Sequence, residues 1–212
     1  NYGGTINIIN SATKLKVKPS ILIVSSSSVY SSSEDTPVYE NFLCSPLNPY
    51  GISKLAAENY ATLMAKHLNI FIARPFFIIG PGKVGDVCSD WAYDIACIEA
   101  GKKEFISVGN TNATRDFLSI GDAVRAFIKI IENGTPGNKY NVCSNNPVHL
   151  LELFKLFNNF SNIDLNKSIF LDSGKDRKLE ASYRVGNNIK LKNIGWEKND
   201  PFNLVINDIL DY

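Results

Sequence analysis

The sequence predicts an α/β fold built on a parallel sheet, and three observations lead to this expectation. Residues 21–24 (ILIV) and the segment 69–77 are mostly apolar runs, which suit strands that are buried on both faces. Segments with helical periodicity lie between such runs, as the crossovers of a parallel sheet require. Proline and glycine mark the breaks, for example at residues 80–82 (GPG).

Each element can be justified in chain order. Residues 1–14 have helical periodicity, and residues 31–47 form a polar, Ser- and Pro-rich loop. Asn48 and Pro49 supply a cap and a first turn, which start a helix that should run to about residue 67. The remaining pattern predicts a strand at 69–77, a helix at 88–100, strands at 104–108 and 115–120, a helix at 121–133, a strand at 139–143 and a helix at 148–158, followed by a mixed tail from 168.

Composition excludes several classes of function. The 22 Lys and Arg nearly balance the 21 Asp and Glu, so the net charge of +1 gives no basic field for nucleic acid. No run of 18 apolar residues occurs, so the sequence predicts no membrane span. The 4 cysteines form no C-x-x-C pair and the 2 histidines add no cluster, so we expect no metal site. Buried free thiols in a cytoplasmic protein are the expected alternative.

Tyr50 and Lys54 lie four residues apart on the predicted helix, so their side chains share one face. An ammonium group one turn away favours the phenolate form of a tyrosine. Such a pair can act as general acid or base toward a carbonyl or hydroxyl oxygen. Ser26 follows the strand at 21–24, and the sites of α/β proteins form at the carboxyl ends of their strands. Ser26 is therefore placed to hydrogen-bond the same oxygen. The alternatives are a surface contact between Tyr50 and Lys54 and a solvated serine loop.

At these residues the chain resembles the extended short-chain dehydrogenase/reductases that act on nucleotide sugars, the NAD-dependent epimerase/dehydratase family. The similarity runs in order along almost the whole chain, which makes it far more specific than a Tyr-x-x-x-Lys pair alone. Within the family, RPFFIIGPG and TRDFLSIGDAVRAF are most similar to the branch that reduces GDP-linked 4-keto-6-deoxy-mannose. The matching segments are SSSVY at 26–30, NPYGISK at 48–54, ARPF at 73–76, GPG at 80–82, VGN at 108–110, RDF at 115–117, Asp122, YNV at 140–142, GW at 195–196 and LDY at 210–212.

The resemblance implies a Rossmann-like, doubly wound parallel sheet that lacks its N-terminal strands, with a smaller C-terminal α/β part that binds substrate. Residues 1–80 would form the C-terminal half of the dinucleotide-binding domain, with the N-terminal half absent. Residues 81–212 would form mostly the substrate domain, with 115–145 partly returning to the Rossmann sheet. In the family a glycine-rich strand–turn–helix lies roughly a hundred residues before the serine motif, whereas 25 residues precede Ser26. We therefore expect a longer parent chain.

The resemblance also implies an enzyme that uses NAD or NADP to reduce a 4-keto-6-deoxy sugar nucleotide. Tyr50 would donate and accept the proton, Lys54 would bind the nicotinamide ribose, and Ser26 would hold the sugar C4 oxygen. The implied cofactor contacts are Ser25, Tyr50, Lys54, Pro75 and Phe76. The implied substrate contacts are Ser26, Ser28, Phe77, Arg115 and Arg177, with Arg115 on the diphosphate. A homodimer through helices 1–14 and 49–67 is implied as well.

Two positions depart from the family pattern, since Phe77 stands where asparagine is usual and Ser31 where glycine is usual. Two other functions stay open: a nucleotide-sugar C4-epimerase, and a non-catalytic fragment with a sugar-nucleotide-binding or interaction role. A 4,6-dehydratase is disfavoured, because that activity needs a further acid/base group and its usual glutamate position is Ser28 here.

Residues 80–85 (GPGKVG) also match the G-x-G-x-x-G pattern of dinucleotide-binding loops. Asp86 and Asp90 would repel a pyrophosphate at the start of the next helix, and Pro81 removes an amide donor. We therefore expect a loop beside the substrate at this position and not a second cofactor cradle.

Overall fold

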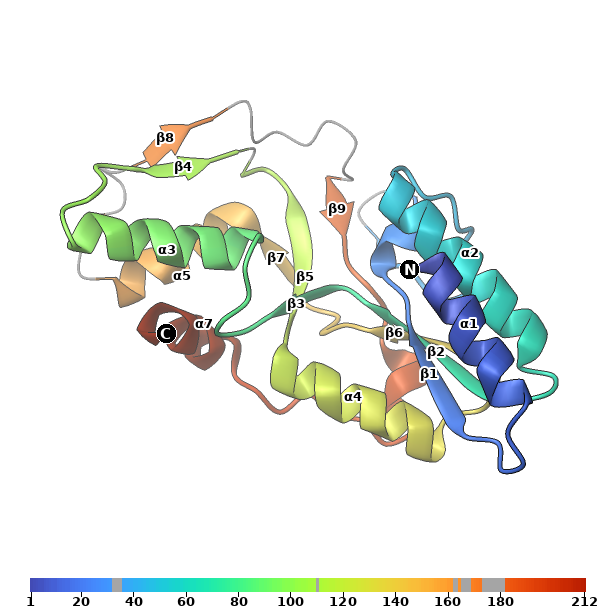
Figure 1. Cartoon of the computed structure of the whole chain (residues 1–212). Helices are drawn as coiled ribbons and strands as arrows, with labels where there is room; N and C mark the ends of the chain where they lie inside the picture. The colour runs from blue at the N-terminus through green and yellow to red at the C-terminus, as the bar shows by residue number, and fades with distance from the viewer. Residues whose placement is uncertain (32–35, 110, 162–163, 165–168, 173–181) are drawn as a thin grey trace.

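The computed structural model describes residues 1–31, 36–109, 111–161, 164, 169–172 and 182–212. Its first sheet consists of three parallel strands, β1 (Ser20–Val24), β2 (Asn69–Pro75) and β6 (Lys139–Val142), in the order β1-β2-β6. Two helices cover one face and a third covers the other (Figure 1). The first pair is α1 (Tyr2–Thr13) and α2 (Pro49–Met64), and the helix on the opposite face is α4 (Ile120–Asn133). The predicted α/β fold with a parallel sheet is confirmed.

Strand β2 lies in the middle of the first sheet and shows how this layer is packed. All its residues after Asn69 are buried, as expected for a strand with helices on both faces. Ile70 and Ile72 pack against α1 and α2, whereas Phe71 and Ala73 pack against α4. Successive side chains alternate between the two faces of the sheet, so helices on both sides hold the strand. The position of its carboxyl end is therefore fixed.

A second, mixed sheet carries the other part of the molecule (Figure 1). Its strands are β3 (Phe77–Ile79), β5 (Thr114–Ser119), β7 (Pro147–His149) and β9 (Tyr183–Arg184). The central strand β5 runs parallel to β3 and β9 and antiparallel to β7. The core on this sheet contains residues of α3 (Val87–Glu99), α5 (Leu150–Phe160) and α7 (Phe202–Asp211). The remaining elements are the parallel pair β4 (Ile106–Val108) and β8 (Ile169–Leu171), the 3-10 turn η1 (Ser27–Val29) and α6 (Ile189–Lys192).

Two predicted segments are divided in the structure. The strand expected at 69–77 is two strands, because β2 pairs with β6 whereas Phe77 pairs with Phe117 in the second sheet. The helix expected at 148–158 begins at Leu150, after the short strand β7. His149 ends that strand and caps the helix, since its Nδ1 accepts the N–H of Leu151 at 3.3 Å. Both single-element predictions were therefore wrong at these junctions.

All four cysteines are free. Cys88 and Cys143 are buried, whereas Cys44 and Cys97 are half-buried, so the expectation of buried thiols holds for two of the four. Among the described residues, no helix combines the length and apolar character needed to cross a bilayer. The division of the chain near residue 80 into a dinucleotide-binding part and a substrate part stays a prediction.

Candidate active site

The serine loop, residues 25–28, begins at the carboxyl end of β1. The N–H of Ser25 continues the sheet by donating to the carbonyl of Ala73 at 2.8 Å. Ser26 caps η1, and its Oγ accepts the N–H of Ser28 at 3.1 Å. The Oγ of Ser25 is buried and has no hydrogen-bond partner within the described part of the chain. A buried hydroxyl of this kind marks a place where a ligand can supply the missing bond.

Helix α2 brings Tyr50 and Lys54 to this loop. The helix starts as predicted, with Pro49 in its first turn and the Asn48 Oδ1 accepting the N–H of Gly51 at 2.8 Å. The Lys54 Nζ donates to the carbonyl of Val24, the last residue of β1, at 2.8 Å. The same Nζ lies 5.6 Å from the centre of the Tyr50 ring. The predicted pairing of Tyr50 with Lys54 beside the serine loop is therefore present in the geometry.

Gly51 explains how closely α2 approaches the serine loop. A Cβ atom at this position would lie 2.2 Å from the carbonyl oxygen of Ser28. Only glycine allows this contact, so the first turn of α2 rests directly on η1. Tyr50, the preceding residue, is 48% exposed, which leaves its ring accessible to a ligand.

The electrostatics at the end of β1 are set by Lys54. Burial lowers the pKa of Lys54 below its ordinary value, because desolvation penalises the ammonium. The hydrogen bond to the Val24 carbonyl holds the ammonium at the strand end in spite of this penalty. A positive charge held there stabilises negative charge that develops on a neighbouring oxygen.

Pro75 and Phe76 lie at the carboxyl end of β2, the neighbour of β1. Both are buried, and the N–H of Phe76 donates to the carbonyl of Val142 at 3.0 Å. The Phe76 ring packs against Tyr30 with 6.4 Å between the ring centres. An apolar wall is thus present beside the serine loop, where the resemblance implies the nicotinamide ring.

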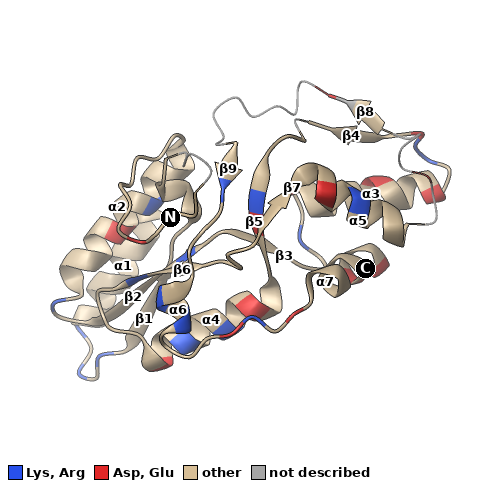
Figure 2. Ribbon diagram, turned by 180° about the vertical axis from the view of Figure 1, so that it is seen from behind, with Lys and Arg blue, Asp and Glu red and all other residues tan. Residues whose placement is uncertain are grey.

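Two arginines lie side by side on the second sheet, and one of them contacts the serine loop. Arg115 on β5 and Arg184 on β9 are register partners, so their side chains leave the same face of the sheet. The Arg115 guanidinium lies 5.3 Å from the centre of the Phe77 ring and donates to the carbonyls of Thr114 and Ser182. The Arg184 Nη1 lies 3.5 Å from the Oγ of Ser28. Figure 2 shows basic residues on both β5 and β9.

Arg184 was not predicted as a site residue. It lies on a two-residue strand in the tail that the sequence pattern left unassigned, and it belongs to no motif. The only available signal was an isolated arginine between Tyr183 and Val185 in a short β-prone stretch. Arg177, the predicted second phosphate contact, lies outside the described residues.

Asp116, the residue after Arg115 on β5, joins the loops that follow β6 and β9. Its carboxylate is fully buried, and Oδ1 accepts the N–H and the hydroxyl of Ser144, both at 2.7 Å. Oδ2 accepts the N–H groups of Asn145 at 3.0 Å and Gly186 at 3.2 Å. Burial raises the pKa of Asp116 to about 6, although the four hydrogen bonds act in the opposite direction. The carboxylate fixes the turn after β6 and the chain after β9 against β5.

The glycine cluster at 80–85 is not a phosphate cradle. Asp86 caps α3, and its Oδ1 accepts the N–H of Ser89 at 3.0 Å. The other carboxylate oxygen pairs with Lys83 at 2.7 Å. An acidic side chain therefore occupies the helix N-terminus that a pyrophosphate would need, as expected from the sequence.

The parallel sheet, the serine loop and the Tyr50–Lys54 helix turn define the class of protein. Residues 1–143 match the profile of the NAD dependent epimerase/dehydratase family, and the chain belongs to this family. It is 30% identical over 204 residues to GDP-6-deoxy-D-mannose reductase of Pseudomonas aeruginosa, covering 93% of this chain and 66% of the reductase. It is 29% identical over 182 residues to UDP-glucose 4-epimerase of Bacillus subtilis, covering 76% of this chain and 53% of the epimerase.

A solved structure supports the same relationship. RMD from Pseudomonas aeruginosa, complexed with NADPH, superposes with a TM-score of 0.90 at 29% identity, covering 98% of this chain and 71% of RMD. This similarity confirms the Rossmann-like character of the fold. The chain spans about two thirds of the length of the curated reductase and about half that of the epimerase.

The residues of this chain fit the nicotinamide-ribose end of NAD or NADP. Ser25 offers an unpartnered buried hydroxyl, Lys54 offers an ammonium at the same strand end, and Phe76 offers an apolar wall. A ribose needs hydroxyl and amine partners, and a nicotinamide ring needs an apolar surface with few polar groups. Three independent features at the carboxyl ends of β1 and β2 thus match what the nicotinamide ring and its ribose require.

Proposed function

We propose that this chain carries the catalytic and sugar-nucleotide-binding part of an NAD(P)-dependent nucleotide-sugar oxidoreductase that reduces a 4-keto-6-deoxy sugar. The observation that carries the proposal is the hydrogen bond of Lys54 to the end of β1, which sets Tyr50 beside the serine loop. The four free cysteines support a reducing, cytoplasmic location.

The residues act on the C4 oxygen of the sugar. Ser26 donates a hydrogen bond to this oxygen, and the Tyr50 hydroxyl delivers the proton that turns the keto group into a hydroxyl. The Lys54 ammonium stabilises the phenolate left on Tyr50, which recovers its proton from solvent. A bound reduced nicotinamide supplies the hydride. Tyr50 and Ser26 are thus the proposed catalytic pair, and Lys54 also holds the cofactor ribose.

The diphosphate of the substrate binds on the second sheet. The side chains of Arg115 and Arg184 leave one sheet face and remain 7% and 8% exposed, and guanidinium groups match phosphate oxygens in geometry and charge. Arg184 reaches Ser28, so the arginine pair extends directly to the serine loop. Phe77 packs against Arg115 and fixes its orientation at the position where asparagine is usual. The substrate therefore spans from the arginines to Tyr50.

A C4-epimerase is the second candidate, because the similarity to UDP-glucose 4-epimerase of Bacillus subtilis is nearly as high in identity. Epimerisation uses the same tyrosine and serine at the same oxygen. A 4,6-dehydratase would need an additional acid/base group, and position 28 offers a serine hydroxyl bonded to Arg184 in place of a carboxylate.

Incubation of the full-length protein with sugar nucleotides decides between these functions. Oxidation of NADPH or NADH by a GDP-linked 4-keto-6-deoxy sugar would support the reductase. Interconversion of C4 epimers of a sugar nucleotide without net cofactor use would favour the epimerase. Formation of a 4-keto-6-deoxy product from GDP-mannose or dTDP-glucose, seen by mass spectrometry, would contradict both.

Tyr50→Phe tests the proposed proton donor. We expect a loss in kcat of about 10²–10⁴-fold, since general acid–base catalysis contributes this much. Binding of the sugar nucleotide, measured by calorimetry, should stay unchanged because the ring and its packing remain. Tyr93→Phe on α3 is the matched control, since this tyrosine is also exposed, at 64% against 48% for Tyr50, but is remote from the serine loop. Wild-type turnover in Tyr50→Phe would exclude the mechanism.

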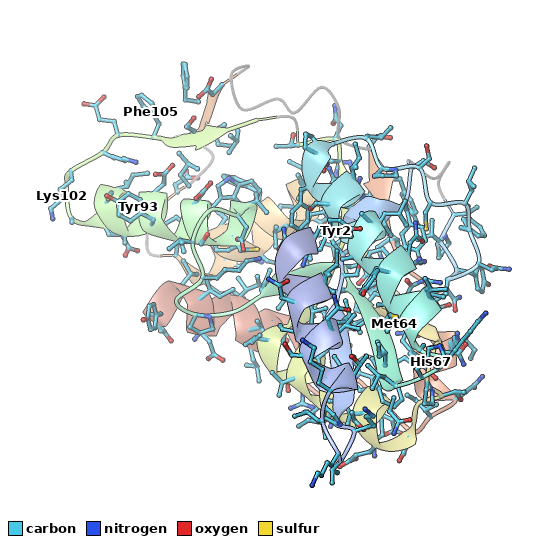
Figure 3. All side chains as sticks on the ribbon, turned by 45° about the vertical axis from the view of Figure 1, so that its right-hand side comes forward. Tyr2, Met64, His67, Tyr93, Lys102 and Phe105 are labelled. Atoms are coloured by element: carbon cyan, nitrogen blue, oxygen red, sulfur yellow. The ribbon has the colours of Figure 1, made fainter. Side chains whose placement is uncertain are left out.

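We further propose a homodimer through the outer faces of α1 and α2. Ile8 on α1 and Leu63 on α2 are 61% and 59% exposed, which is costly for large apolar side chains on two packed helices. Figure 3 views these helices from outside, with Tyr2 and Met64 labelled. Two copies of the helix pair would bury these side chains in a four-helix interface.

A further inference from the structure

A network of buried, hydrogen-bonded side chains joins β2, α2 and the segment that follows the serine loop. Its centre is Arg74 of β2, which is 1% exposed, and Glu58 of α2, which is 0% exposed. The Arg74 Nη2 lies 2.7 Å from the Glu58 Oε2, and the Arg74 Nε donates to the Oε1 at 3.0 Å. This is a two-point pairing in which the planar guanidinium fork matches the carboxylate.

The network continues through Tyr30, which follows the serine loop after the η1 turn. The Arg74 Nη1 donates to the Tyr30 hydroxyl at 2.7 Å, and that hydroxyl donates to the Asn141 Oδ1, also at 2.7 Å. Burial raises the pKa of Tyr30 well above its ordinary value, so the hydroxyl remains a donor. The Asn141 Nδ2 in turn donates to the carbonyl of Val38 at 2.9 Å. Four segments that are distant in sequence are thus tied to one guanidinium.

Three of the joined segments carry or adjoin a group of the proposed site. Glu58 is one helical turn after Lys54, Tyr30 follows the turn that Ser26 caps, and Arg74 directly precedes Pro75. None of the three network side chains is exposed enough to meet a substrate. Their effect on the site can only act through the position of the segments that they join.

We propose that Tyr30, Glu58 and Arg74 form a positioning network that fixes the distance between Ser26 and the Tyr50–Lys54 turn. The inference rests on the proposed function of that turn. A charged network suits this place because its hydrogen bonds are directional. A guanidinium group has five donors in a fixed plane and permits one arrangement of its partners, whereas apolar packing permits several. The network acts beside Gly51, where α2 approaches the Ser28 carbonyl so closely that an added Cβ would lie 2.2 Å from its oxygen.

Tyr30→Phe tests the network with the smallest change, since it removes one hydroxyl and keeps the ring. We expect kcat to fall about tenfold or more, because small misplacements of reacting groups have effects of this size. The KM for the sugar nucleotide should stay within about twofold, because the loss acts on geometry and not on ground-state binding.

Tyr140→Phe is the matched control for a lost buried hydroxyl. Tyr140 is 1% exposed on β6, and its hydroxyl accepts the N–H of Thr135 at 2.9 Å, on the side of the sheet that packs on α4. Both variants are expected to lose stability, measured by thermal unfolding, but Tyr140→Phe should keep the wild-type kcat. Equal losses of kcat in both, or an unchanged kcat in Tyr30→Phe, would overturn the proposal.

A double-mutant cycle checks that the residues act as one unit. Glu58→Gln removes the charge at constant shape, and in combination with Tyr30→Phe it should lower kcat no further than the larger single effect. Effects that simply multiply would contradict a shared network.

Hydrogen exchange measures the network without reference to activity. In Tyr30→Phe the amides of the serine loop and of the first turns of α2 should exchange faster, whereas in Tyr140→Phe those amides should keep their protection. Unchanged exchange at α2 would refute the positioning role. If the wild-type protein neither reduced nor epimerised sugar nucleotides, the proposed function would be refuted instead. The hydrogen-exchange comparison would then still test whether the network positions the serine loop and α2.

Discussion

Asp116 shows how one buried carboxylate can hold two distant loops. Four donors from three backbone N–H groups and one hydroxyl surround it, so its ionised form is well solvated by the protein. Complete burial nevertheless dominates and raises its pKa to about 6. Because Arg115 is the neighbouring residue, the protonation of Asp116 bears on the loops that frame the arginine pair.

The raised pKa predicts a definite pH dependence of stability. Between about pH 4 and pH 6 the folded protein holds a proton on Asp116 that the unfolded chain, with a pKa near 3.9, has already released. The contribution of Asp116 to the free energy of unfolding is therefore greatest below pH 4 and falls by on the order of 3 kcal/mol as the pH rises past 6.

Carbon-13 NMR of the Asp116 carboxyl group measures this directly, and we expect a titration midpoint near 6. Asp116→Asn should remove the corresponding part of the pH dependence of unfolding in denaturant. A midpoint below 4 would show that the four hydrogen bonds outweigh burial.

At the scale of single elements, α2 owes its place to three sequence features that act at its first turn. Asn48 caps the helix, Pro49 favours its start, and Gly51 lets it contact the Ser28 carbonyl. Lys54 then reaches the end of β1, and Glu58 pairs with Arg74 below it. The helix is therefore anchored at successive turns on the face that carries Tyr50.

Gly51→Ala tests the contact between α2 and the serine loop. The added Cβ would lie 2.2 Å from a backbone oxygen, so the helix must move. We expect a loss of about 1–3 kcal/mol in the free energy of unfolding, the usual cost of overpacking, together with loss of turnover.

Gly3→Ala on α1 is the control for that substitution. Its Cβ would meet nothing within 4 Å, and we expect a gain of up to about 1 kcal/mol from helix propensity. A neutral Gly51→Ala, measured by urea unfolding beside this control, would show that α2 does not depend on the close approach.

The elements that the sequence predicted well are those with a long internal pattern. Helix α2 and the strands of the first sheet agree with expectation within a few residues, because caps and apolar periodicity are local signals. The junction at Phe76 and the strands β7 and β9 were missed, since each depends on a partner strand far along the chain. Of the candidate site, Ser26, Tyr50 and Lys54 could be proposed from their motifs. Arg184 could not, because it joins the site through its register with Arg115 and its contact with Ser28, both of which are long-range.

At the scale of the whole molecule, two exposed apolar surfaces stand out on opposite faces of the first sheet. One lies on α1 and α2 and includes Ile8 and Leu63. The other, on α4, consists of Ile120, Val124, Ile128 and Ile131, all more than 40% exposed at helical spacing. Soluble proteins seldom leave two such surfaces uncovered, so each is expected to have its own partner surface.

Light scattering on the full-length protein can assign the proposed homodimer to one of these surfaces. Leu63→Arg on α2 should convert the dimer to a monomer at micromolar concentration, because an unpaired charge would be buried in the interface. Ile128→Arg on α4 is the matched control, since it places the same charge on a side chain 50% exposed, and it should leave the dimer intact. The reverse result would move the interface to α4.

The contact between Ser28 and Arg184 also has a temporal consequence during synthesis. The two residues are 156 positions apart, and the nearby bridge between Val38 and Gly186 spans the same pair of segments. At ribosomal rates the serine loop emerges roughly ten to thirty seconds before β9 exists to meet it. Loop closure over such distances is slow, and the early strands are open to wrong partners in the interval. Strand β9 thus completes one wall of the candidate site well after the serine loop and the start of α2 have been translated.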